Sequence, residues 1–122
     1  MAGSLLKRCL KAARNLAPLY QHSHFPYASP ELLEKFDIYQ VRKRLLDRGA
    51  RLILQDGRAV IEVNSLFHRE RGRFSVAHEI GHIILNECAG RDPFSISHGD
   101  PKEESYCDQI AEILVAPNEL AR

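Results

Sequence analysis

The segment RGRFSVAHEIGHIILNE, residues 71–87, constrains the fold more than any other part of the chain. Apolar side chains occupy almost every side of a helix drawn through it, which predicts a helix buried all round. His78, Glu79 and His82 nevertheless lie inside this segment. Burying two imidazoles and a carboxylate without partners is costly, because each group loses its contact with water. The helix therefore needs a polar partner or a metal ion beside it.

The two histidines have the spacing of metal ligands. His78 and His82 are four residues apart, so on a helix their Cβ atoms lie about 5–6 Å apart and both rings can reach one ion. Glu79 is rotated from His78 by about 100°, so it is no third ligand but can contact a water on the open side of the metal. This HExxH arrangement predicts one zinc ion per chain.

A catalytic zinc usually has three protein ligands, so we expect one more from a neighbouring element. Glu104 and Asp108, again four residues apart, share one face of a predicted last helix. We expect Glu104 to complete the ligand set and Asp108 to accept the spare N–H of a ligating histidine. Without the histidines upstream, an acidic pair at this spacing is equally well explained as part of a solvated helix face.

Other polar residues are weaker candidates. His98, in a predicted loop over the site, is a candidate for stabilising an oxyanion, and Tyr106 and His68 are candidates of a similar kind. Side chains of this sort more often take no part in catalysis. Residues excluded by their helix face or by a capping role are Glu87, Cys88 and Glu103.

Local patterns place the elements around this helix. Segments 50–55 and 58–64 predict two strands joined by Asp56-Gly57, a dipeptide favoured in tight type I′ hairpin turns. Asp100 as N-cap with Pro101 after it predicts the last helix, which ends before Pro117. Ser29 predicts the cap of a helix that begins at Pro30, and Asp37 predicts a helix that continues through Val41, Leu45 and Leu46 to Gly49.

The start of the chain is a basic amphipathic helix. Apolar residues recur at helical spacing from Leu5 to Ala17, with lysines and arginines between them and no acidic residue before Glu31. This helix covers the core, or alternatively it is an organelle transit peptide. A proline-containing linker follows, so we divide the chain into residues 1–29, helix and linker, and residues 30–122, the domain.

Composition limits the class of protein. The chain has 122 residues, enough for one small domain, and a formal net charge of +1, so no overall field recruits nucleic acid or an anionic membrane. No apolar run is long enough to span a membrane. The three cysteines, Cys9, Cys88 and Cys107, show no CxxC spacing and suit free, buried thiols in a reducing cytoplasm. The fold class predicted is α+β, mainly helical, with an antiparallel hairpin beside the HExxH helix.

Two stretches resemble a known family. RGRFSVAHEIGHIIL and the later EESYCDQIAEILVAP are similar to the two helical motifs of the ImmA/IrrE family of metallopeptidase domains. His78, Glu79 and His82 fall on the first motif, and Glu104 falls on the glutamate of the second, with Pro117 on its closing proline. The positions that depart from the usual Ala, Asn and Phe are Cys107, Asp108 and Ile110. The resemblance covers residue 37 to the C-terminus.

The resemblance implies a zincin-like fold and a cytoplasmic peptidase that cleaves a partner repressor of the helix-turn-helix class. Members often continue beyond the second motif, whereas this chain stops at Arg122, which leaves open that the domain is incomplete at its C-terminal end.

Our main hypothesis is zinc-dependent hydrolysis of a peptide bond in a protein partner. Zinc held by His78, His82 and Glu104 activates a water, and Glu79 takes its proton and passes it to the leaving amine. The strand Val60–Asn64 is expected to pair with an extended substrate. The alternative is a non-catalytic module in which the metal is a structural staple and the domain holds a transcription regulator or toxin partner.

Overall fold

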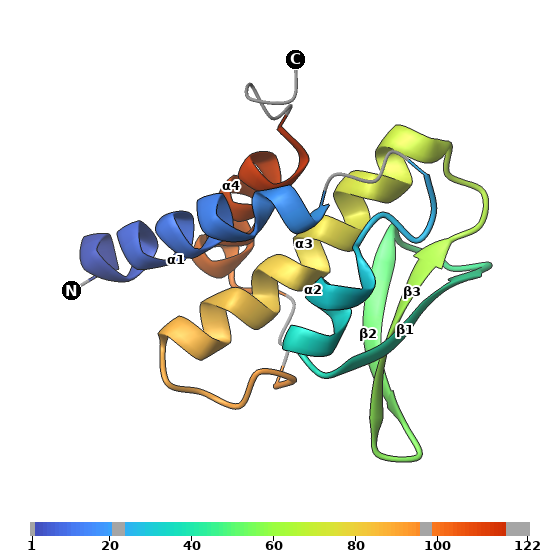
Figure 1. Cartoon of the computed structure of the whole chain (residues 1–122), viewed down its shortest axis with the longest axis horizontal. Coiled ribbons are helices and arrows are strands. Elements are labelled where there is room, and N and C mark those ends of the chain that lie inside the picture. The colour runs from blue at the N-terminus through green and yellow to red at the C-terminus, as the bar shows by residue number, and fades with distance from the viewer. Residues whose placement is uncertain (1, 21–23, 96–98, 117–122) are drawn as a thin grey trace.

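The structure, a computed structural model, describes residues 2–20, 24–95 and 99–116. The described elements follow in the order α1 (Ala2–Leu16), a 3-10 helix η1 (Ala17–Tyr20), α2 (Pro30–Lys35), β1 (Ile38–Arg44), β2 (Ala50–Gln55), β3 (Arg58–Asn64), α3 (Arg69–Cys88) and α4 (Pro101–Val115). The helices gather on one side of a small sheet (Figure 1). The predicted α+β class, mainly helical, is confirmed. None of the described helices is long and apolar enough to cross a membrane.

The sheet has three strands in the order β1-β3-β2. The predicted hairpin is confirmed, because β2 and β3 pair antiparallel with Gln55 opposite Arg58. Asp56 and Gly57 between them have φ values of 54° and 77°. Positive φ at both central residues is the requirement of a type I′ turn, which matches the twist of the two strands.

The helix predicted from Asp37 to Gly49 is wrong. Residues Ile38–Arg44 form β1, which pairs parallel with β3 and places Val41 opposite Ile61. Asp37 has a φ of 58°, a left-handed conformation that no helix N-cap adopts. Leu45, which the helical spacing placed in the core, is 69% exposed. The segment becomes a strand because β3 offers it a partner edge, a contact between distant residues that local spacing does not reveal.

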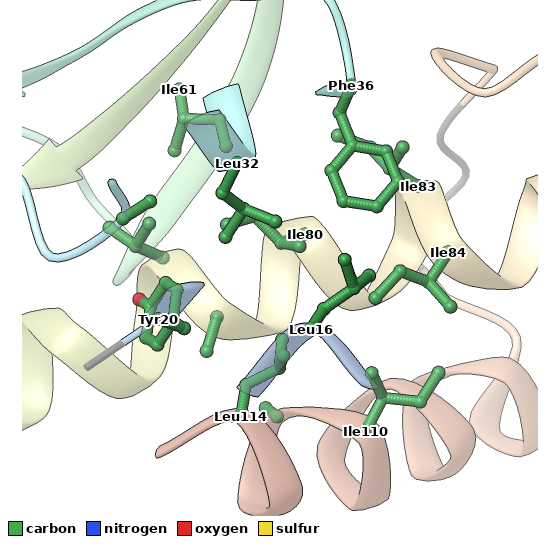
Figure 2. Close-up of a cluster of buried hydrophobic side chains, with 14 of the residues drawn as sticks. Leu16, Tyr20, Leu32, Phe36, Ile61, Ile80, Ile83, Ile84, Ile110 and Leu114 are labelled. Atoms are coloured by element: carbon green, nitrogen blue, oxygen red, sulfur yellow. The ribbon is translucent and has the colours of Figure 1, made fainter. Parts of the chain in front are cut away.

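The core explains why α3 is apolar all round. Side chains on its different faces meet the sheet, α2, α1 and α4, so few sides of the helix reach solvent (Figure 2). The labelled residues that surround it come from each of these elements: Leu16, Leu32, Ile61, Ile110 and Leu114. Full burial of each such side chain contributes about 1.5–3 kcal/mol relative to its exposure. The predicted buried helix is confirmed.

Helices α3 and α4 approach each other closely at Gly81. A Cβ atom there would lie 3.0 Å from the main-chain oxygen of Cys107. A side chain there would be tighter than most real contacts, so glycine favours this approach, which brings one face of α4 against the histidine face of α3. Burial, followed by the nearby Glu104 and Glu79 carboxylates, raises the pKa of the Cys107 thiol. Cys107 is therefore a protonated packing residue behind the site.

The cap residues Ser29 and Asp100 and the first helix follow the sequence prediction, whereas Glu103 does not. Ser29 Oγ accepts a hydrogen bond from the main-chain nitrogen of Leu32. Asp100 Oδ1 accepts one at 3.0 Å from the main-chain nitrogen of Lys102. Glu103, expected to serve the cap of α4, instead accepts two hydrogen bonds from Arg91. The predicted amphipathic helix is present as α1, which packs on α3 and α4.

Arg73 of α3 forms hydrogen bonds with both η1 and α4. Its Nη1 atom donates to the main-chain oxygen of Val115 near the end of α4, at 2.8 Å. Its Nη2 atom donates to the oxygen of Tyr20 at 3.1 Å, and the Tyr20 hydroxyl donates to the main-chain oxygen of Arg73. One side chain of α3 thus fixes both η1 and the last turn of α4.

Candidate metal centre

Three side chains from two helices converge on one point. His78 and His82 stand on consecutive turns of α3, and Glu104 faces them from the first turn of α4. One ligand atom from each of the three lies within 4.8 Å of the other two. Glu104 Oε2 lies 2.7 Å from His82 Nε2 and 3.4 Å from His78 Nε2. We call these three side chains the metal cluster.

The distances and the donor atoms fit a metal ion. Ligand atoms around a tetrahedral ion with bonds of about 2.1 Å lie about 3.4 Å apart. The His78–Glu104 distance has this value. The shorter His82–Glu104 distance requires only a small movement of the Glu104 carboxylate, whose side chain is 31% exposed. Two imidazole nitrogens and a carboxylate oxygen are a donor set that divalent ions accept. The metal cluster is therefore compatible with a bound metal ion.

Asp108 contacts one of the two histidines. Its Oδ1 atom lies 2.8 Å from Nδ1 of His78. The other ring nitrogen, Nε2, lies 3.4 Å from Glu104 Oε2, so the two sides of the ring contact two carboxylates of α4. The structure thus places Asp108 where the spacing predicted it, one turn beyond Glu104 on the same helix.

A cleft opens beside the metal cluster. Its volume is about 440 Å³, and its lining includes His78, Glu79 and Glu104. The other lining residues are Phe74 and Ser75 of α3 and the segment 47–50 that leads into β2. Glu79 is 2% exposed yet borders the cleft. Glu79 thus borders the same cleft as His78 and Glu104 of the metal cluster.

This geometry agrees with the comparison of the whole chain with known families. The Peptidase M78 family, described as the IrrE N-terminal-like domain, matches residues 32–120. The matched range includes the sheet and both helices that carry the metal cluster. The chain belongs to this family. The resemblance of the two motifs is thereby confirmed, and the chain is a metallopeptidase-like domain. No curated protein and no solved structure matches it.

Tyr106 of this IrrE N-terminal-like domain lies away from the metal cluster. Two positions along α4 from Glu104 correspond to a rotation of about 200°. Its side chain lines a separate hollow of about 250 Å³ with Leu5 and Lys102. His68 is exposed at the N-cap position of α3 and is not among the residues that line the cleft. His98 lies outside the described residues.

The strand expected to pair with substrate lies in the centre of the sheet. The segment Val60–Asn64 belongs to β3, the central strand, whose two edges are taken by β1 and β2. Its main-chain groups are engaged within the sheet, so it cannot add a further strand. The prediction that this strand pairs with substrate is wrong. Ala50 at the start of the edge strand β2 lines the cleft instead.

Asn64 has a structural role that the sequence did not reveal. Its Nδ2 atom donates to the main-chain oxygens of Leu46 and Arg48 at 3.0 and 2.9 Å. Its Oδ1 atom accepts from the main-chain nitrogen of Leu66 at 3.0 Å, and its own main-chain nitrogen donates to the oxygen of Gly49. Asn64 thereby holds the segment that forms one wall of the cleft. The partners come from distant positions, so no local pattern signals them.

Proposed function

We propose that this IrrE N-terminal-like domain is a zinc-dependent peptidase that hydrolyses a peptide bond in a protein partner. The observation that carries the proposal is the convergence of His78, His82 and Glu104 beside the buried Glu79 in one cleft. His78, His82 and Glu104 would hold the ion. A bound zinc ion supplies Lewis-acid chemistry, because it polarises a carbonyl and lowers the pKa of water.

The residues of the chain supply the proton transfer and the orientation. Glu79 takes a proton from the attacking water on its carboxylate and then delivers it to the nitrogen of the leaving amine. Glu79 is 2% exposed, and this burial restricts the movement of its side chain. Asp108 holds the His78 ring through Nδ1, which keeps the ring correctly turned.

The substrate class follows from the family and from the cleft. A protein substrate is what a peptidase-type domain implies, and an extended segment of chain would lie between α3 and the start of β2. We propose, from the resemblance, that the partner is a helix-turn-helix repressor and that the reaction takes place in the cytoplasm.

The test compares the wild type with Glu79→Gln. Both proteins are loaded with zinc, and their metal content is measured by elemental mass spectrometry before they are incubated with quenched peptides and with candidate repressors. We expect about one zinc in each, and cleavage by the wild type that falls about 10²- to 10⁴-fold in Glu79→Gln.

Two outcomes would contradict the proposal. Equal cleavage by the two proteins would remove Glu79 from the reaction. Zinc bound by both proteins, with no cleavage of any substrate by the wild type, would favour the non-catalytic module in which the metal is a structural staple.

A further inference from the structure

The sheet has a second face, on the side away from the helices. Side chains alternate along a strand, so Glu62 points to the face opposite that of Ile61. Ile61 points into the core towards Leu32 and Ile80 (Figure 2). All the α-helices lie on that inner side, whereas no described helix covers the outer face (Figure 1). Glu62 therefore lies on a face that the described parts of the chain leave open to partners.

Three arginines surround Glu62 on this outer face. Arg42 on β1 and Arg51 on β2 lie directly opposite it in the register of the sheet. Arg42 contacts Oε2 through Nε at 3.0 Å and Nη2 at 2.9 Å, and Arg51 contacts Oε1 through Nε at 2.8 Å. Arg44 Nη1 lies 3.7 Å from Oε2. We call Arg42, Arg44 and Arg51 the arginine cluster.

The arginine cluster carries more positive charge than Glu62 can neutralise. One carboxylate faces three guanidinium groups, so two positive charges remain in excess around a side chain that is itself fully buried. Each guanidinium has five N–H donors, and Glu62 uses only a few of them. Arg44 remains 58% exposed. Glu62 thus fixes the arginines in one place while much of their donor capacity faces solvent.

A hollow adjoins the arginine cluster. Its volume is about 420 Å³, and Arg42 and Arg58 line it together with Tyr39 and Gln40. The Arg58 guanidinium lies 4.5 Å from the centre of the Tyr39 ring, which holds it over the sheet. Asp56, at the hairpin turn, is the acidic residue in the lining. The outer face therefore combines oriented cations with a concave surface.

The chain that joins β1 and β2 leads from the outer face to the cleft. Arg44 ends β1 and Arg51 lies in β2, and the segment between them contains Asp47 and Arg48, which form an ion pair at 3.9 Å and both line the cleft. One short stretch of chain thus connects the outer face of the sheet with the cleft. A single extended partner could contact both.

We propose that the outer face of the sheet binds an acidic segment of the protein substrate, so that the arginine cluster and Arg58 act as a docking site beside the cleft. Guanidinium groups pair with carboxylates through two parallel hydrogen bonds, which suits Asp- and Glu-rich chain. A formal net charge of +1 and a compact cluster favour a local acidic segment over the long backbone of a nucleic acid. That the partner is a substrate rests on the proposed peptidase function.

The binding test uses the full chain with Glu79→Gln, so that hydrolysis plays no part. A fluorescein-labelled peptide with a run of glutamates, its glutamine counterpart and a DNA duplex are titrated and followed by anisotropy at low and high salt. The test variant is Arg44→Gln with Arg58→Gln, which spares the two arginines that bond Glu62 most closely. The matched control is Lys7→Gln with Lys11→Gln, which removes the same charge from exposed positions of α1.

We expect the glutamate peptide to bind the control as it binds the parent protein, and to bind the Arg44/Arg58 variant at least ten-fold more weakly. The glutamine peptide should bind neither. Equal binding by the test and control variants would overturn the proposal. Tighter arginine-dependent binding of the DNA duplex would overturn it in favour of a nucleic-acid face.

The link to catalysis is tested separately in the protein with Glu79. A substrate with a glutamate run should be cleaved with a lower KM than its glutamine counterpart, and this advantage should disappear in the Arg44/Arg58 variant with kcat unchanged. Arginine-dependent binding without any cleavage would refute the peptidase function and leave the docking site standing. Cleavage with no preference for the acidic substrate would refute the docking site alone.

Discussion

Gly81 of α3 lies so close to Cys107 of α4 that a Cβ atom would meet the Cys107 carbonyl oxygen at 3.0 Å. Gly81 is next to the histidine His82 on α3, and Cys107 is three residues from Glu104 on α4. The contact therefore lies close in sequence to the residues of the metal cluster on both helices. The approach of the two backbones thus determines whether ligands on different helices can share one ion.

Replacement of Gly81 by alanine should therefore affect stability and metal binding together. The added methyl would lie 3.0 Å from a backbone atom of α4, so the two helices must separate by a few tenths of an ångström to accommodate it. We expect a loss of about 1–3 kcal/mol in the free energy of unfolding and a weaker affinity for zinc. Urea unfolding and zinc titration measure the two effects. Ser105→Ala, at an exposed position of α4, is the control, and unchanged zinc affinity in Gly81→Ala would contradict this account.

Zinc should stabilise the folded protein through the metal cluster. A ligand that binds only the folded state at 100 times its Kd contributes about 2.7 kcal/mol. We expect added zinc to raise the Tm of the wild type and to have little effect on Glu104→Ala or His82→Ala. Glu103→Ala is the matched control, because this neighbouring glutamate bonds Arg91 and lies outside the metal cluster. An equal rise of Tm in Glu104→Ala would exclude Glu104 as a ligand.

Removal of Asp108 should weaken metal binding without unfolding the domain. Its side chain is exposed, but it holds Nδ1 of His78 at 2.8 Å. Loss of such a partner typically lowers metal affinity about 10- to 100-fold. Competition with a chromogenic chelator gives the affinity of Asp108→Ala. Glu112→Ala, one turn further along α4 and also exposed, should bind as the wild type does.

Replacement of Asn64 should weaken substrate binding more than it weakens zinc binding. Its side chain holds the backbone of Leu46 and Arg48, which belong to the segment beside the cleft. Asn64→Ala leaves these carbonyl groups without their donor and should cost about 1–3 kcal/mol of stability. We expect a higher KM with zinc affinity retained. A variant with reduced stability but wild-type KM would show that the segment takes no part in substrate binding.

Lowering the pH should weaken the contribution of Glu62 to the free energy of unfolding. Burial acts to raise the pKa of Glu62, but hydrogen bonds from Arg51 and Arg42 outweigh it and lower that pKa below its usual value of 4.5. The folded state therefore binds the proton less tightly than the unfolded state does. The stabilisation is complete above about pH 4.5 and is lost as the pH falls through the folded pKa.

The variant Glu62→Gln gives the measurement. Because the arginines are partly exposed, we expect it to lose only about 1–2 kcal/mol at neutral pH. Urea unfolding at several pH values should show the difference from wild type shrinking below pH 4.5, the usual value for this carboxyl. Glu34→Gln, exposed on α2, is the control. A difference that grows in acid would contradict the sign of the shift.

The sequence predicted the parts of the molecule that local physics determines. The all-round apolar pattern of residues 71–87, the Asp56-Gly57 turn and the Asp100 cap each depend on residues close in the chain. The spacing of four residues brought His78 and His82 together, and Glu104 with Asp108, for the same reason. The juxtaposition of the two pairs needed a guess about helix packing, which the distances between their side chains now support.

Contacts between distant segments account for the errors. Residues 38–44 have an apolar spacing that fits a helix, and their pairing with β3 is formed only in the folded chain. The same applies to Asn64, whose partners lie in the segment before β2, and to Glu62, whose arginines come from two other strands. A buried asparagine or glutamate on a central strand is recognisable as unusual only once the strand order is known.

The packing of α1 on α4 has a consequence for biosynthesis. Among the described elements, α1 leaves the ribosome first and α4 last, yet α1 packs against both α3 and α4. The buried residues Cys9, Ala13 and Leu16 of α1 therefore lack part of their final packing partners while the sheet and α3 are synthesised. The burial of α1 is complete only when α4, the last described helix, has packed against it.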